Sequence, residues 1–138
     1  MGKIIHLQLK PAKGEPMKVV TAVEAIANHG LRDDANAGRT KRQVLIIERE
    51  LLDEFQLPIG DVRENITVEG IALAGASAGT RLRVGQALLE VTLDCAPCEF
   101  IEGKRPGLRK AMDGKRGTLF KVIEGGDINL GDAIEVVA

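Results

Sequence analysis

The chain has 138 residues, 44% of them hydrophobic and 28% charged, which fits one domain over residues 1–138 that can bury a core. A net charge of −1 argues against a broad nucleic-acid surface, and three Phe with no Trp or Tyr leave few rings for stacking on bases. No apolar run could span a membrane, and Lys10, Pro11 and Lys13 interrupt any signal peptide, so we expect a cytoplasmic protein with neither nucleic-acid nor membrane partners.

Strands and short helices alternate in the first half of the chain. Partial alternation of apolar residues predicts a strand over residues 3–9, and a continuous apolar run predicts a buried strand over 42–47. Between them, Thr21 and Glu24 form a capping-box pattern that predicts a helix ending at Gly30. A second helix is expected over residues 48–55, because three apolar side chains share one face before a proline.

Strands dominate the second half. They are expected over residues 65–68, 81–84, 89–94, 118–123 and 133–137, with a short helix over 108–112. Leu89, Val91 and Leu93 share one face, so this half-buried strand ends by presenting Asp94 and Cys95. Because strands outnumber helices and the connections are short, we predict a mainly β fold, a closed or nearly closed barrel with a few short peripheral helices.

Cys95 and Cys98 form a Cys-x-x-Cys pair in a chain with no other cysteine. Zinc is weakly indicated, because a structural site needs four ligands and the two histidines are distant and unpatterned. A redox dithiol normally stands between a strand and a helix, and Pro106 and Gly107 delay any helix here. The remaining interpretations are a single thiolate acting as nucleophile, sulfur carrier or metal ligand, and two small apolar side chains packed under a loop.

Two polar segments contain candidate anion-binding residues. In the segment 60–67, Arg63 can contact a phosphate or carboxylate through two nitrogens, and Asn65 can donate and accept hydrogen bonds at once. The glycine-containing loop 29–42 ends with the cations Arg39 and Arg42. Taken singly, each residue fits a solvated surface better than a binding site. The same ambiguity applies to a later basic group, which comprises Lys104, Arg105, Arg109, Lys115 and Arg116.

The order of these segments resembles the MOSC domain, the module also found at the C-terminus of molybdenum cofactor sulfurases. The similar segments are 30–38, 42–44, 60–66, 73–85, 97–98, 125–128 and 131–132. The glycine–aspartate loop departs from the family pattern, with Asp33 where a glycine is usual and Asn36 where a histidine is common. Pro97-Cys98 is similar to the pair that contains the family's hallmark cysteine. The resemblance extends over nearly the whole chain.

The resemblance implies a β-barrel with a pocket for molybdenum cofactor (molybdopterin) or its sulfur. It makes Cys98 the functional cysteine, as a persulfide carrier or a candidate molybdenum ligand, and Cys95 an accessory one. Positively charged and amide side chains would neutralise and orient the phosphate of the cofactor. The candidates for that contact are Arg39, Arg42, Arg63 and Asn65.

Two functions remain open from the resemblance. The chain could carry sulfur or molybdenum cofactor during metal–sulfur cofactor maturation, or it could be a molybdenum-cofactor-dependent reductase of N-hydroxylated compounds. Sulfurase enzymes draw sulfur through a pyridoxal phosphate domain, and we do not expect this chain itself to bind pyridoxal phosphate. A cysteine desulfurase or a molybdoenzyme is therefore the expected partner.

Overall fold

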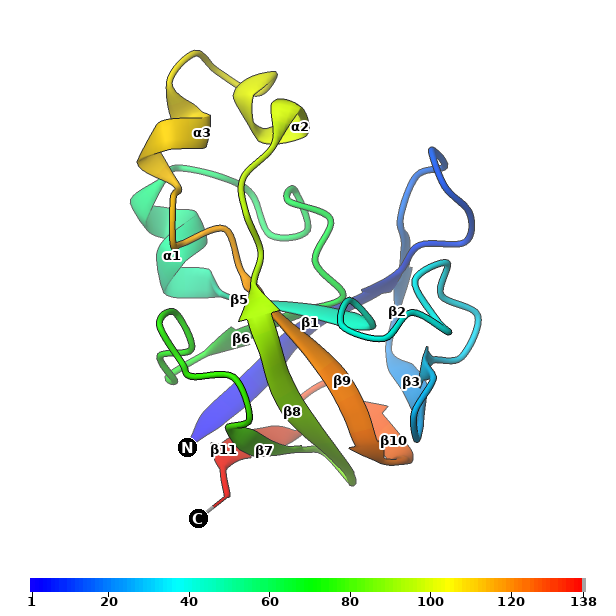
Figure 1. Ribbon diagram of the computed structural model, residues 1–138. Helices are drawn as coiled ribbons and strands as arrows, with labels where there is room; N and C mark the ends of the chain where they lie inside the picture. The colour runs from blue at the N-terminus through cyan, green and yellow to red at the C-terminus, as the bar shows by residue number, and fades with distance from the viewer. Residues whose placement is uncertain (138) are drawn as a thin grey trace.

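A closed β-barrel forms the centre of the protein in the computed structural model, which describes residues 1–137 (Figure 1). The barrel strands are β1 (Gly2–Leu9), β5 (Val44–Glu48), β6 (Ile66–Glu69), β7 (Arg81–Val84), β8 (Ala87–Asp94), β9 (Thr118–Glu124) and β11 (Ala133–Val136). They follow the order β11-β7-β8-β9-β5-β6-β1, and pairing of Gly2 with Ile134 closes the ring. The expected mainly β barrel is confirmed.

Shorter elements surround this ring. β2 (Lys18–Val20) extends the sheet beyond β1, while β3 (Ala22–Ile26), β4 (Gly30–Leu31) and β10 (Gly126–Asn129) form a separate sheet in the order β10-β3-β4. The helices α1 (Arg49–Glu54), α2 (Glu99–Glu102) and α3 (Leu108–Ala111) gather at one end of the barrel (Figure 1). Within residues 1–137, no helix is long and apolar enough to cross a membrane.

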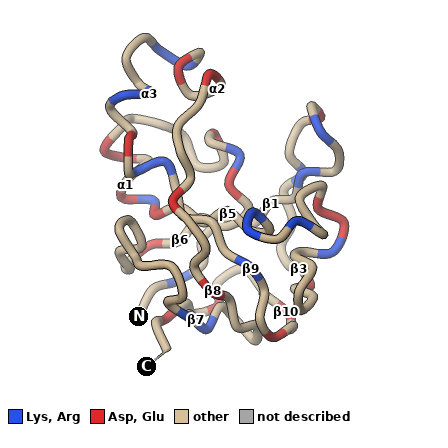
Figure 2. Tube along the Cα trace, viewed as in Figure 1, with Lys and Arg blue, Asp and Glu red and all other residues tan. Residues whose placement is uncertain are grey.

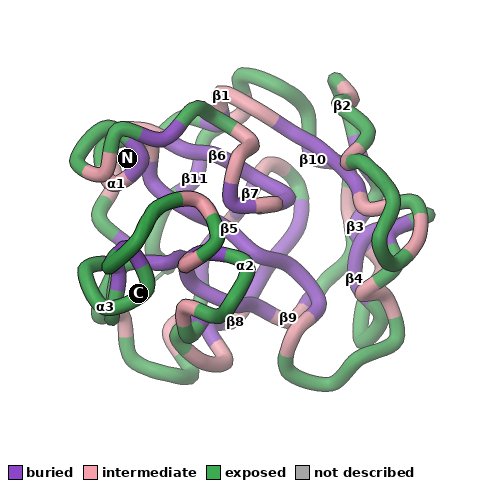
Figure 3. The backbone as a smooth tube through the Cα atoms, turned by 90° about the horizontal axis from the view of Figure 1, so that it is seen from above, coloured by how far each residue is buried: buried purple, intermediate pink, exposed green. Residues whose placement is uncertain are grey.

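One apolar cluster fills the barrel, and another lies between the barrel and the helices. Fully buried side chains such as Ile4, Leu89 and Phe120 fill the barrel, and Figure 3 shows buried backbone along its strands. A second cluster lies under the helices, where Ile101 of α2 and Leu108 of α3 pack with the apolar face of α1. Because burial of a large aliphatic side chain contributes about 1.5–3 kcal/mol, each short helix is held mainly by its core contact. The segment that follows Cys98 is therefore anchored.

The helix expected over residues 21–30 is wrong, because β3 and β4 occupy this region. Val23 and Ala25 are buried, whereas Glu24 between them is exposed. Pairing places Val23 opposite Ile128 and Ala25 opposite Gly126 of β10. Pairing with β10 stabilises the strand over the helix that the local capping-box pattern predicted. The prediction failed because β10 lies about a hundred residues away in the sequence, and local patterns carry no information about such a partner.

The other expected strands and the helices near 48–55 and 108–112 are present within a few residues of their expected bounds. The sequence did not predict the short strands β2 and β10 or the helix α2. The last omission matters most, because α2 begins at Glu99, directly after Cys98, and not beyond Pro106 and Gly107. One turn of helix needs little sequence signal when a buried residue, here Ile101, holds it in place.

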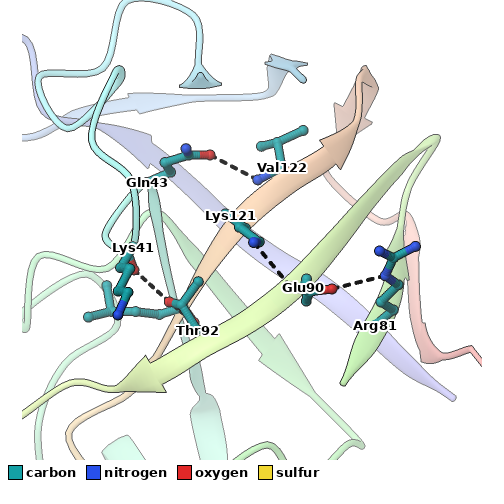
Figure 4. A network of polar contacts seen from close by, with 8 residues as sticks. Lys41, Gln43, Arg81, Glu90, Thr92, Lys121 and Val122 are labelled. Atoms are coloured by element: carbon teal, nitrogen blue, oxygen red, sulfur yellow. Dashed lines mark hydrogen bonds and ion pairs between the residues drawn. The ribbon is translucent and has the colours of Figure 1, made fainter. Parts of the chain in front are cut away.

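A buried glutamine fixes the loop that contains Arg39 to the barrel (Figure 4). Gln43 donates from Nε2 to the Arg39 carbonyl at 2.7 Å and accepts from the Val122 backbone N–H at 2.9 Å. In the same loop, the Lys41 carbonyl accepts a hydrogen bond from the Thr92 hydroxyl of β8. The loop is thus attached to two adjacent barrel strands.

We expect Gln43→Ala to lower the free energy of unfolding by about 1–3 kcal/mol, because it leaves a buried N–H and a carbonyl without partners. The exposed Gln86, whose side chain makes no hydrogen bond within the described residues, provides the matched control. Urea denaturation of Gln43→Ala and Gln86→Ala measures the difference. Equal midpoints for the two variants would contradict the structural role of Gln43.

Candidate functional site

An open pocket of about 390 Å³ lies where β8 ends, within the size range of small-molecule sites. Its walls come from the loop after β1, the loop before β5, Arg63, the segment after β8 and the start of β9. The side chains of Leu45 and Leu119 give it an apolar portion. The structure brings together four residues predicted from sequence: Arg39, Arg42, Arg63 and Cys98.

The two cysteines differ in environment although both line the pocket. Cys98 is exposed, whereas Cys95 is 7% exposed and packs with Leu45 and Leu119. Cys95 is also fixed through its backbone, which donates to the Gly117 carbonyl at 2.9 Å. The Cys98 carbonyl accepts from two backbone N–H groups of α2, so the helix fixes the backbone beside the accessible thiol. Cys98 is the thiol that can meet a reactant, and Cys95 packs as a small apolar side chain.

The pocket wall is positively charged. Its six cations are Lys10, Lys13, Arg39, Arg42, Arg63 and Arg116. Within residues 1–137 none of the six forms an ion pair, while other Lys and Arg residues form nine. Figure 2 shows basic positions in the loops near the ends of β1 and β5. Cations gathered without carboxylate partners favour the binding of an anion.

Both burial and the neighbouring cations act on the pKa of Lys10. Burial lowers the pKa of its ammonium group, and the nearby charge of Arg63 lowers that pKa further. Arg39 and Arg116 act in the same direction, and only Asp34 opposes them. The electrostatic field in the pocket therefore disfavours the addition of positive charge, so a bound anion would relieve the repulsion.

Arg63 occupies the pocket wall in a strained backbone conformation. Its φ is 63°, in the left-handed region that non-glycine residues rarely adopt. The side chain donates from Nη2 to the Glu15 carbonyl at 2.8 Å, while its Nε is buried without a partner. The ring of Phe100 lies 5.8 Å from the guanidinium carbon and 4.5 Å from Lys104 Nζ. The contact between Arg63 and Phe100 connects α2 to the segment that contains Arg63, and the contact of Lys104 with the same ring is local.

The expectation that Asn65 contacts the cofactor is corrected, because its side chain is 2% exposed and lies outside the pocket lining. Its Oδ1 accepts from the Leu45 N–H at 3.0 Å, and its Nδ2 donates to the Gln8 carbonyl at 3.2 Å and to Asp34 Oδ1 at 3.1 Å. These bonds use both amide hydrogens and the amide oxygen. Asn65 therefore holds the backbone and Asp34 beside the pocket and does not line it.

Sequence reasoning left Arg116 unresolved within a basic group, and the structure separates it from that group. Lys104, Arg109 and Lys115 form ion pairs with carboxylates, and Arg105 donates to the Phe55 carbonyl. Arg116 instead is 6% exposed, lines the pocket, and has Nε and Nη1 buried without partners. One sequence feature could have identified Arg116: it lies just before β9. This strand pairs with β8, which ends at Asp94 directly before Cys95.

Lys10 and Lys13 are further pocket residues that sequence reasoning missed. They lie in the loop after β1, and no motif marks them. Within residues 1–137 no group of three His, Cys, Asp or Glu side chains could hold a metal ion. Cys98 is thus the accessible soft donor of the pocket, and a metal bound beside it would have to arrive with most of its ligands already in place.

Comparisons with known proteins place these features in a family context. The family model described as MOSC domain matches residues 33–135. The YUAD protein from Bacillus subtilis has a solved structure similar to this one, with a TM-score of 0.77, 20% identity, and coverage of 99% of this chain and 96% of that chain. YiiM from Geobacillus stearothermophilus gives a TM-score of 0.79 at 20% identity, with coverage of 100% and 76%. YiiM from Escherichia coli gives 0.73 at 21%, with coverage of 99% and 70%. No curated protein matches the sequence.

We expect Asn65→Ala to change the stability of the protein and Arg63→Gln to change its affinity for anions. Asn65→Ala should lower the free energy of unfolding by roughly 2–4 kcal/mol, because it leaves several buried groups without partners. Arg63→Gln removes one partly exposed cation, so it should change stability by less than about 1 kcal/mol and weaken anion binding. Urea denaturation and phosphate titration of both variants measure the two effects. If Arg63→Gln lost as much stability as Asn65→Ala and kept its anion affinity, Arg63 would be a structural residue and not an anion-binding one.

Proposed function

The chain belongs to the MOSC domain family, and on that premise we propose that Cys98 accepts sulfur as a persulfide and delivers it to molybdenum cofactor held in the cationic pocket. One observation carries the proposal: the accessible thiol of Cys98 opens into the same pocket as six cations without carboxylate partners. A thiol beside an anion-binding wall suits a protein that brings sulfur to a charged ligand.

The loading of Cys98 with sulfur needs neither an external oxidant nor a reductant. The Cys98 thiolate attacks the outer sulfur of a persulfide on a donor cysteine, the S–S bond of the donor breaks, and the donor thiolate leaves. Cys98 then carries the transferred sulfur as its own persulfide. A cysteine desulfurase is the proposed donor and a molybdoenzyme the proposed recipient. The exposure of Cys98 supports this step, because the donor sulfur must approach the thiol in line with the bond that breaks.

The pocket residues fit molybdenum cofactor in charge and in donor type. Arg39, Arg42 and Arg63 would hold its phosphate, because their side chains line the pocket and form no ion pair among the described residues. Cys98 would be the soft protein ligand. When bound, the cofactor would supply a molybdenum centre whose sulfur ligation can change. The protein's own part is to orient the phosphate end and to keep the Cys98 thiol at the pocket.

The alternative proposal is a molybdenum-dependent reductase of N-hydroxylated compounds, which would use the same thiol as a metal ligand. Analysis of freshly purified protein from a host that makes the cofactor separates the alternatives. Labile sulfur on Cys98 without metal supports the carrier, whereas stoichiometric molybdenum with reductase activity supports the enzyme. A reversible Cys95–Cys98 disulfide, with neither molybdenum nor labile sulfur, would reject both in favour of a redox dithiol.

We expect Cys98→Ser to abolish loading with cyanide-labile sulfur by a cysteine desulfurase, because serine cannot form a persulfide. Cys95→Ser should load normally and lose about 1–3 kcal/mol of stability, since it puts a hydroxyl into an apolar cluster. Cyanolysis after desulfurase treatment measures loading, and thermal denaturation measures stability. Equal or reversed losses of labile sulfur would reject Cys98 as the carrier.

The basic loop provides a second test of the proposed function. We expect Arg39→Ala/Arg42→Ala to bind a phosphorylated pterin more weakly than wild type, with a shallower dependence on salt, because salt screens the attraction that these charges supply. The control is Lys41→Ala/Lys110→Ala, which removes two charges that do not line the pocket. Titration calorimetry at low and moderate salt compares them. Identical binding curves for the two double variants would show that Arg39 and Arg42 are solvated and do not contribute to binding.

A further inference from the structure

The segment that follows β8 has one unpaired backbone edge. On the β7 side of β8, pairing ends where the Val91 N–H donates to the Thr80 carbonyl at 2.8 Å. On the β9 side it continues as far as the Cys95 N–H, which donates to the Gly117 carbonyl. Neighbouring residues of a strand direct their backbone groups to opposite edges. The N–H and carbonyl of Ala96 therefore point to the side where β7 has ended.

This edge is extended and open to solvent. Ala96 precedes Pro97, which restricts it to extended conformations, and Cys98 has a φ of −133° and a ψ of −174°. Asp94, Ala96 and Cys98 are exposed. Among the described residues, the N–H groups of Ala96 and Cys98 and the Ala96 carbonyl form no hydrogen bond. An exposed row of unpaired backbone groups is a template on which another chain can add a strand.

A groove of about 640 Å³ lies beside this edge. Ala96 and Pro97 line it together with residues of α2 and α3, and it shares no lining residue with the cationic pocket. The Glu102 carboxylate joins the two helices, because it accepts from the N–H groups of Gly107 at 2.8 Å and Arg109 at 3.1 Å. The groove is thus preformed, which lowers the cost of ordering it around a bound chain.

Two carboxylates at this surface have no cation beside them. Asp113 lines the groove, and neither Asp113 nor Asp94 forms an ion pair among the described residues. Burial first and the charge of Asp113 second raise the pKa of Asp94, so each carboxylate feels the charge of the other. Arg109 of the groove pairs with Glu99 instead. A lysine or arginine on a bound chain would relieve the repulsion between the two carboxylates.

We propose that this edge and groove bind an extended, cysteine-bearing segment of a partner protein, which pairs with Ala96 as an added strand and presents its sulfur to Cys98. The inference rests on the proposed function in one respect, because it identifies the bound segment as the part of the sulfur donor that carries the persulfide. Cys98 lines the pocket and directly follows two residues of the groove. A protein sulfur can therefore approach Cys98 along the groove while a small ligand occupies the pocket.

Disulfide exchange tests the docking without sulfur transfer. A short peptide with a central cysteine flanked by threonine, valine and lysine is prepared as its mixed disulfide with thionitrobenzoate. The Cys98 thiolate attacks the peptide sulfur, the S–S bond breaks, and coloured thionitrobenzoate leaves, so absorbance gives the rate. N-acetylcysteine activated in the same way is the reference, because it has no peptide to pair. The rate of Cys98→Ser is subtracted as the contribution of Cys95.

The ratio of the peptide rate to the N-acetylcysteine rate is the readout, so a general change in thiol reactivity cancels. In wild type we expect a ratio of about 10 or more, the effect of two or more backbone hydrogen bonds. Ala96→Pro removes the N–H of the edge and should lower the ratio about 2- to 10-fold. The matched control, Ala96→Ser, keeps this N–H and should leave the ratio unchanged.

The charge of the groove is tested separately with a peptide that has glutamate in place of lysine. Wild type should react faster with the lysine peptide, and Asp94→Asn/Asp113→Asn should lose this preference because the two carboxylates are gone. The control variant Asp127→Asn/Glu135→Gln should keep it. These two exposed carboxylates lie on β10 and β11, at the end of the barrel away from α2 and α3 (Figure 1).

Three outcomes overturn the proposal. The first is equal rates of wild type with the peptide and with N-acetylcysteine, and the second is equal ratios for Ala96→Pro and Ala96→Ser. The third is self-association of wild type that Ala96→Pro abolishes, which would assign the edge to a second copy of this chain. Desulfurase-driven loading of Cys98 is measured on the same protein. If loading failed while peptide docking depended on Ala96, the sulfur carrier would be rejected and the docking edge would stand.

Discussion

The buried amide of Asn65 is the contact on which the arrangement of the pocket depends. Its carbonyl oxygen binds the backbone of β5 and its amino group binds the backbone of β1, so one side chain sets the spacing of two strands. A third bond reaches Asp34, whose carboxylate also accepts the Lys10 N–H at 2.8 Å. The loops that contribute Lys10 and Arg39 are therefore located by the same buried cluster, because a fully satisfied polar network permits few alternative geometries.

Around this junction the protein maintains an electrostatic arrangement that opposes its own stability. Eight Lys and Arg residues outside the pocket have acidic partners, as in the pairs of Arg49 with Asp53 and Glu69. The pocket cations have none, and burial first and the charge of Arg63 second lower the pKa of Lys10. Natural proteins keep such unfavourable features mainly where a ligand compensates for them. Six cations in one lining without a carboxylate distinguish the pocket more clearly than its shape does.

Local sequence patterns predicted the barrel well and its pocket in part. Alternating apolar residues located β8, because a half-buried strand leaves a two-residue period. The region of β3 was misassigned because its pairing with β10 is long-range, whereas the capping pattern at Thr21 is local. Arg63 and Asn65 are two residues apart, and only the fold shows that one faces the pocket and the other is buried. Asp33 is explained by its φ of 67°, a conformation that aspartate tolerates in place of the usual glycine.

The left-handed backbone at Arg63 has a consequence for how this surface would change over many generations. Glycine adopts that conformation without strain, so Arg63→Gly would relax the backbone while removing a pocket charge. Against that gain, glycine would lose the hydrogen bond to the Glu15 carbonyl and the contact with Phe100, and it would make the unfolded chain more flexible. Any exchange at this position therefore sets relief of backbone strain against the loss of a pocket cation and its anchoring contacts.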